Sequence, residues 1–144
     1  PAELETFELG RGRVLEEGHD VAFIGIGTGV GIAVEAAQKA RARGLRPTVV
    51  DARFVKPLDT ALLDCLASTH ERLVTVEENV LAGGFGSAVL ECVAGRGVEV
   101  IRFGLPDAFV PHGDRERLLA DVGLTPDAVA ATVCSRPVGL AHAR

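Results

Sequence analysis

The segment Asp20–Gly27 (DVAFIGIG) constrains the fold most, because its apolar run has no polar alternation and ends in glycines. Strands of this kind have both faces covered, as in the parallel sheets of α/β proteins. Further short apolar runs follow at Pro47–Asp51, Arg72–Glu77 and Val98–Phe103, and stretches with helical spacing separate them. Four strands separated by helices predict an α/β sandwich with a mainly parallel sheet.

Helix boundaries are marked by capping residues. The first helix is predicted over Thr28–Arg43, with Gly44 as its C-terminal cap. Another begins in the glycine-rich stretch Gly83–Ala94. Side chains that favour the N-cap position precede the remaining three helices, at Asp59, Asp114 and Thr125.

The two ends of the chain differ from this core. The leader Phe7–Glu17 is charged and broken by glycines, which suits an edge strand. We expect one domain over residues 1–134, with a leader and edge strand at 1–18 and an α/β core at 19–134, followed by a loose tail at 135–144. The chain starts at Pro1 and contains no Met, so we expect it to be a fragment of a longer protein.

Composition excludes several classes of protein. Apolar residues make up 47% of the chain, which is too many for a disordered segment. No apolar run approaches the roughly 18 residues that a membrane span needs. The net charge is −5, and the 15 basic residues form no stripe, so neither a nucleic acid nor a membrane is an expected partner.

Cysteine and histidine residues give no sign of a reactive or metal site. Cys65, Cys92 and Cys134 lie far apart in apolar stretches, so we expect buried, reduced thiols in a cytoplasmic protein. The four histidines are isolated, and none pairs with another at metal-ligand spacing, so no metal residue is predicted.

Glycine-rich or mixed polar segments follow each predicted strand. Because the carboxyl ends of parallel strands meet at one edge of a sheet, these segments should lie together, where open α/β sheets build their sites. They contain no set of nucleophile, base and orienting residue, which favours a docking surface over a catalytic site. The segments are Gly25–Gly31, Asp51–Asp59, Glu77–Ser87 and Gly104–Gly113.

Two of these segments allow a second interpretation. Gly25–Gly31 could hold a dinucleotide at a helix N-terminus, with Asp51 on the ribose, although Val30 and Ile32 stand where the motif needs glycine. A tight structural turn is the simpler interpretation. Glu77 and Glu78 could likewise act as acid and base, or they could cap and pair locally.

Three segments together resemble a known family. VDARFVKPLD (Val50–Asp59), TVEENVLAGGFGSAVLE (Thr75–Glu91) and GLPDAFVPHG (Gly104–Gly113) are similar to the C-terminal domain of the 1-deoxy-D-xylulose-5-phosphate synthases, a thiamine-diphosphate-dependent branch of the transketolase family. The middle segment alone would also fit the β subunits of 2-oxoacid dehydrogenases, whose domain docks a carrier protein. The other two segments argue for the synthases.

The resemblance implies a three-layer α/β/α fold with a five-stranded, mostly parallel sheet whose first strand is antiparallel. It implies that thiamine diphosphate and Mg²⁺ are bound by other domains, and that no catalytic, cofactor-binding or metal residue lies in this segment. The implied reaction condenses pyruvate with D-glyceraldehyde 3-phosphate, and the implied partners are the other domains and a second subunit of a homodimer. The residues we expect at such interfaces are Arg53, Glu78, Asn79, Asp107 and His112.

Overall fold

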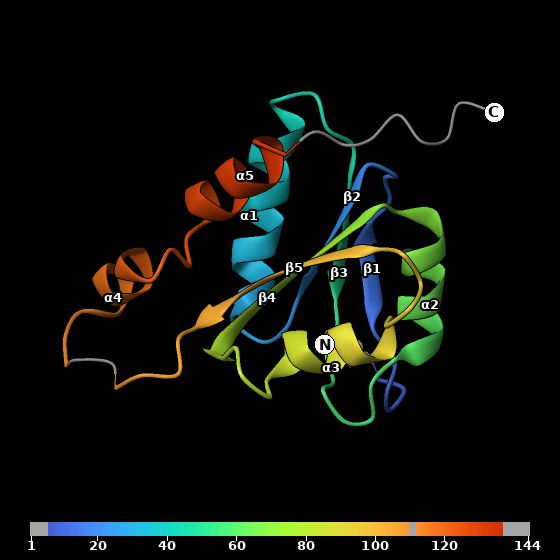
Figure 1. Cartoon of the computed structure of the whole chain (residues 1–144), viewed down its shortest axis with the longest axis horizontal. Coiled ribbons are helices and arrows are strands. Elements are labelled where there is room, and N and C mark those ends of the chain that lie inside the picture. Colours follow the sequence, from blue (N-terminus) through green and yellow to red (C-terminus); the bar gives the residue numbers. More distant parts are fainter. Residues whose placement is uncertain (1–5, 110–111, 137–144) are drawn as a thin grey trace, which may run out of the picture.

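The computed structural model describes residues 6–109 and 112–136. Its five-stranded sheet has the order β1-β3-β2-β4-β5 (Figure 1). β1 pairs antiparallel with β3, and all other neighbours are parallel. The strands are β1 (Arg13–Glu16), β2 (Val21–Gly25), β3 (Pro47–Asp51), β4 (Arg72–Val80) and β5 (Glu99–Leu105).

Helices cover both faces of this sheet. One apolar core lies between the sheet and the helices α1, α4 and α5, and a second lies between the sheet and α2 and α3 (Figure 1). The predicted three-layer fold, with its antiparallel first strand, is therefore confirmed. The helices are α1 (Gly29–Arg41), α2 (Thr60–Thr69), α3 (Phe85–Cys92), α4 (Arg115–Asp121) and α5 (Pro126–Cys134).

The predicted helix caps are found where the sequence places them. The side chains of Asp59, Asp114 and Thr125 each accept a hydrogen bond from a backbone N–H in the first turn of the helix that follows. Gly44 has a φ of 92°, the left-handed conformation expected just after a helix. None of the described helices is long and apolar enough to cross a membrane.

Two of the predicted strands end later than their sequence patterns indicate. β4 runs on to Val80, three residues past the predicted end at Glu77, and its pairing with β5 becomes irregular between Val76 and Val80. β5 likewise continues to Leu105. The polar residues Glu78 and Asn79 hide the extension of β4 from a hydropathy pattern.

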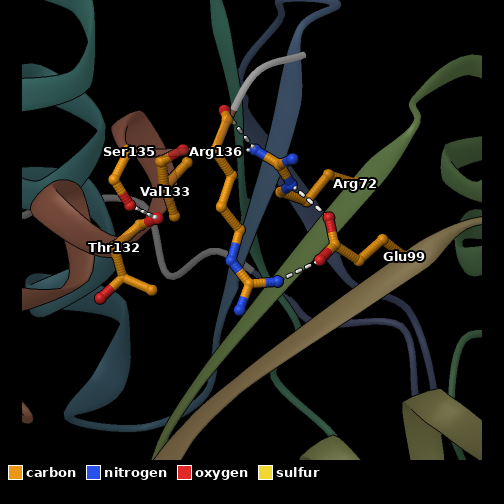
Figure 2. A network of polar contacts seen from close by, with 6 residues as sticks. All are labelled: Arg72, Glu99, Thr132, Val133, Ser135 and Arg136. Carbon is orange, nitrogen blue, oxygen red and sulfur yellow. Dashed lines mark hydrogen bonds and ion pairs between the residues drawn. The ribbon is translucent and has the colours of Figure 1, made fainter. Parts of the chain in front are cut away.

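A buried arginine binds the last helix, α5, to the amino edge of the sheet, which is the edge where the parallel strands begin (Figure 2). Arg72 of β4 donates to Glu99 of β5 at 2.7 Å and to the carbonyl oxygens of Val133 and Arg136. Arg136 also pairs with Glu99. The guanidinium of Arg72 in turn lowers the pKa of Glu99. The predicted loose tail thus starts with residues that are tied to the domain, and the prediction for residues 137–144 lies outside the described residues.

The prediction that all three thiols are buried is wrong. Cys65 is exposed, and Cys92 and Cys134 are only partly buried, although all three are free of disulfides. The reason is the helical period: Leu63 and Leu66 of α2 face the sheet, so Cys65 between them points outward.

His70 joins three separate segments below the surface. Its Nε2 lies 2.9 Å from Oγ1 of Thr48, which also accepts a hydrogen bond from the N–H of Gly18, and its Nδ1 lies 3.2 Å from the carbonyl oxygen of Leu66. This set of partners fits a neutral ring with the proton on Nδ1, which donates to the carbonyl. Burial lowers the pKa of His70 below its usual value of 6.5.

This lowered pKa predicts a loss of stability in mild acid. Below pH 6.5 the unfolded chain takes up a proton at His70 before the folded chain does, so the free energy of unfolding should fall as the pH drops toward the folded pKa. Urea unfolding at several pH values measures the free energy of unfolding of the chain and of the His70→Gln variant. The dependence of this free energy on pH should be less steep in the variant. An equal slope in the two proteins would contradict the role of His70.

Candidate functional site

The turn before α1 is packed against β4. The N–H of Ile26 donates to the carbonyl oxygen of Val76 at 3.1 Å, and a Cβ on Gly29 would collide with that same oxygen. A Cβ on Gly25 would meet the backbone of Val30. Gly25 and Gly29 therefore allow close backbone packing, as the structural-turn interpretation predicts, whereas Gly27 has a φ of 56°, which favours glycine.

Glu77 supplies the cap of α3. Its side chain is 1% exposed, and its two carboxylate oxygens accept from the backbone N–H groups of Phe85 and Gly86 at 2.7 and 2.8 Å. A carboxylate at a helix N-terminus is stabilised by charge-assisted hydrogen bonds and by the helix dipole. Gly84 leaves the space for it, because a Cβ there would meet Oε2 of Glu77. Glu77 is thus a structural cap and not a free acid or base.

Glu78 connects three segments at the carboxyl edge. It forms a two-pronged ion pair with Arg115, the first residue of α4, and it accepts from Oγ1 of Thr28 at 2.6 Å. These hydrogen bonds, that of Arg115 first and that of Thr28 second, lower the pKa of Glu78. The pair ties the start of α4 to the turn before α1 across the end of β4.

Arg53 is held in an unusual backbone conformation. Its φ is 58°, a strained value for a residue that is not glycine. The carboxylate of Asp51 accepts from the N–H of Arg53 at 3.0 Å, and the guanidinium lies 4.2 Å from the ring centre of Phe7 in the leader. This cation–π contact joins the leader to the loop after β3.

The predicted interface residues do not form one cluster. Glu78 and the exposed Asn79 line a shallow depression with Val55, and Arg53 lines a neighbouring one with Phe7. Gly27 lines both depressions. Asp107 and His112 are exposed on the loop between β5 and α4, and neither lines these depressions.

Several residues of this edge were beyond the reach of the sequence pattern. Arg115 and Phe7 have no local motif, since their partners Glu78 and Arg53 lie 37 and 46 residues away.

In the dinucleotide alternative, Asp51 would bind a ribose, but one of its oxygens already accepts from the backbone N–H of Arg53. Among the described residues there is also no group of three or more His, Cys, Asp or Glu that could hold a metal ion.

The fold defines a class of domain, a three-layer α/β/α domain with a mostly parallel five-stranded sheet. Comparison with known proteins identifies the family within this class. Residues 10–129 match the family "Transketolase, C-terminal domain". The chain belongs to this family.

Its sequence relatives are more specific. The chain is 52% identical over 130 residues to the 1-deoxy-D-xylulose-5-phosphate synthase of Heliobacterium modesticaldum, covering 89% of the chain and 20% of that protein. It is 45% identical to the synthase of Chlorobaculum tepidum, covering 91% of the chain and 21% of that protein. The resemblance seen in the sequence is confirmed, and the chain spans about a fifth of the length of these relatives.

Solved structures give the same fold. A "split gene transketolase, inactive beta4 tetramer" superimposes with a TM-score of 0.84 and 38% identity, covering 90% of this chain and 43% of that one. A transketolase from Pichia stipitis matches with a TM-score of 0.65 at 18% identity, covering 86% of this chain and 17% of that one. The second likeness concerns the fold alone.

The Glu77 cap predicts an unequal effect of two neighbouring substitutions. Glu77→Gln puts an amide N–H₂ against one of the two buried N–H donors and removes the charge, which should cost about 1–3 kcal/mol of unfolding free energy. Glu78→Gln, at the surface, should cost much less. Urea denaturation measures both, and similar losses for the two variants would show that Glu77 is not the cap on which α3 depends.

Proposed function

We propose that the chain is the C-terminal domain of a thiamine-diphosphate-dependent synthase that condenses pyruvate with D-glyceraldehyde 3-phosphate, with loss of CO₂, to 1-deoxy-D-xylulose 5-phosphate. The product serves isoprenoid, thiamine and pyridoxal biosynthesis. The observation that carries the proposal is the 52% identity with a synthase of this name over nearly the whole chain. We place the enzyme in the cytoplasm.

The domain itself supports assembly and not chemistry. The cofactor thiamine diphosphate and its Mg²⁺ are bound by other parts of the enzyme. The turns of this domain do not fit a diphosphate, because the space beside Gly29 and Gly84 is filled by Val76 and Glu77 of the same chain. The acids at the ends of β3 and β4 have structural tasks: Asp51 holds the Arg53 loop and Glu77 caps α3.

The partners of this domain are the rest of its own subunit and a second subunit of a homodimer. The residues proposed for these contacts stay the five named from the sequence: Arg53, Glu78, Asn79, Asp107 and His112. Each lies in a loop or strand end at the carboxyl edge of the sheet. The loop with Arg53 is strained and partly exposed, which is typical of positions that a neighbouring surface uses.

The proposal predicts a silent domain in an active enzyme. The 144-residue chain, mixed with pyruvate, glyceraldehyde 3-phosphate, thiamine diphosphate and Mg²⁺, should form no 1-deoxy-D-xylulose 5-phosphate, whereas the complete enzyme should form it. NMR detection of the product tests both expectations, the inactivity of the chain alone and the activity of the complete enzyme. Turnover by the chain alone would contradict the silent role, and an inactive complete enzyme would contradict the assigned reaction.

The alternative function, nucleotide binding by Gly25–Gly31 and Asp51, is tested by calorimetry with NAD, NADP and ATP. We expect no heat of binding at micromolar concentrations. Binding that Asp51→Ala abolishes would replace the proposal by that of a stand-alone nucleotide-binding module.

Charge reversal at Arg53 should weaken assembly. Arg53→Glu removes the cation over Phe7 and puts a negative charge beside Asp51, so the leader and the loop should separate. Light scattering of the complete enzyme should then show a lower mass, or its activity should fall. Arg43→Glu is the matched control, because it makes the same charge change at an exposed position after α1. Equal mass and full activity for both variants would remove Arg53 from the interface.

A further inference from the structure

A series of hydrogen bonds at the amino edge of the sheet passes through one buried histidine. The N–H of Gly18, in the turn between β1 and β2, donates to Oγ1 of Thr48 at 2.9 Å, and this oxygen lies 2.9 Å from Nε2 of His70. On the other side of the ring, Nδ1 lies 3.2 Å from the carbonyl oxygen of Leu66 in α2. We call Gly18, Thr48, Leu66 and His70 the His70 clamp. Thr48 and His70 are only 4% and 8% exposed, so water does not replace these partners in the folded chain.

The directions of these hydrogen bonds require a neutral ring. Because Thr48 accepts from Gly18, its hydroxyl proton can be donated to Nε2 of His70, which then carries no proton of its own. The ring proton is on Nδ1, which also lies 2.9 Å from Oγ1 of Thr69, while that hydroxyl donates to the carbonyl oxygen of Cys65. A proton on Nε2 would make this nitrogen a donor and leave the hydroxyl proton of Thr48 without its acceptor. A buried donor without an acceptor destabilises the closed clamp.

The charged groups that act on the ring lie in the turn before β2. Burial lowers the pKa of His70 most, and the nearby His19 lowers it further, whereas the hydrogen bond to Leu66 and the carboxylate of Asp20 act in the opposite direction. The same carboxylate accepts from the backbone N–H of Arg46 at 2.6 Å and lies 3.6 Å from its guanidinium. The proton therefore binds more readily to a ring that water reaches than to the ring in the closed clamp.

The turn between β1 and β2 is held at two separate points. The N–H groups of His19 and Asp20 both donate to the carbonyl oxygen of Arg46, and these bonds hold the start of β2. Gly18, one residue earlier, donates to Thr48 instead. The end of β1 thus depends on Thr48, and through it on His70, whereas β2 has contacts of its own.

The strand that ends at this turn is weakly attached. β1 lies at the edge of the sheet beside β3, and the register of this pair shifts between Val14 and Glu16 (Figure 1). All four residues of β1 are exposed, so the strand buries little apolar surface. Glu16 pairs with Arg41 at the surface, where an ion pair contributes little. A strand of this kind can open while the core stays folded.

We propose that the His70 clamp is a proton-sensitive latch on the edge strand: when Nε2 takes up a proton, Thr48 releases Gly18 and β1 separates from β3 while β2, β3, β4 and β5 stay paired. The step transfers one proton from solvent to the ring and changes no other covalent bond. The opening is local, which distinguishes it from the loss of global stability in acid.

The direction of the pH dependence follows from the lowered pKa. The open state binds the proton more tightly, so its population should rise as the pH falls below 6.5 and should level off below the pKa of the closed clamp. For a single proton the rise is at most about tenfold per pH unit.

Hydrogen exchange of the 144-residue chain, read by mass spectrometry of its peptides, tests the latch. After correction for the pH dependence of the intrinsic exchange rate, exchange in β1 should rise about two- to tenfold between pH 7.5 and pH 5.5. Exchange in β2 and β4 should stay the same. No rise in β1, or an equal rise in all three strands, would overturn the proposal.

Paired variants identify the group that titrates. The pH dependence of exchange in β1 should disappear in His70→Gln and persist in His19→Gln, which changes the neighbouring exposed histidine. Thr48→Val should make exchange in β1 fast at both pH values, because it removes the hydroxyl, whereas Thr48→Ser keeps the hydroxyl and should keep the pH dependence. A pH dependence that survives in His70→Gln, or the same behaviour in both Thr48 variants, would overturn the proposal.

The unsubstituted chain gives a test that does not depend on the folding of a variant. In NMR spectra the rise in exchange of the Gly18 amide should level off at the pH where the His70 ring titrates. A rise that levels off with the His19 ring instead would overturn the proposal. None of these readouts uses synthase activity, so a failure of the latch leaves the assigned reaction untouched.

Discussion

The carboxyl end of β4 organises the rest of this domain. Three consecutive residues there each hold a different segment: Val76 accepts from Ile26 in the turn before α1, Glu77 caps α3, and Glu78 pairs with Arg115 of α4. Because β4 lies between β2 and β5, these contacts lock helices on both faces to one strand. A buried carboxylate is stable at this point only because two backbone donors and a helix dipole meet it.

In this arrangement the acids and several glycines of the carboxyl edge have structural partners within the domain. Open α/β sheets build their sites at the carboxyl ends of their strands, so the position is the usual one for catalysis. Here neighbouring residues fill the space beside Gly25, Gly29 and Gly84. Asp51 and Glu77 accept from backbone N–H groups, and Glu78 pairs with Arg115. These polar groups hold the loops of the carboxyl edge in place.

Much of the fold could be predicted from the sequence, because the signals are local. The uninterrupted apolar run of β2 indicated a sheet covered on both faces, and Asp59, Asp114 and Thr125 marked helix starts through bonds that span three residues. Cys65 shows the limit: its apolar surroundings suggested burial, but the helical period turned it outward. The roles of His70 and Arg72 were missed because their partners come from other segments.

The sequence by itself determined the α/β class, the helix caps and the family resemblance, since each depends on residue types at short spacing. Only the tertiary structure decided what the charged residues at the carboxyl edge do. Glu77 and Glu78 are neighbours with alternating directions along a strand, so one enters the core as a cap and the other reaches Arg115 at the surface. Which side a charge faces, and which distant donor meets it, depends on strand register and helix packing, and those are set by the assembled core.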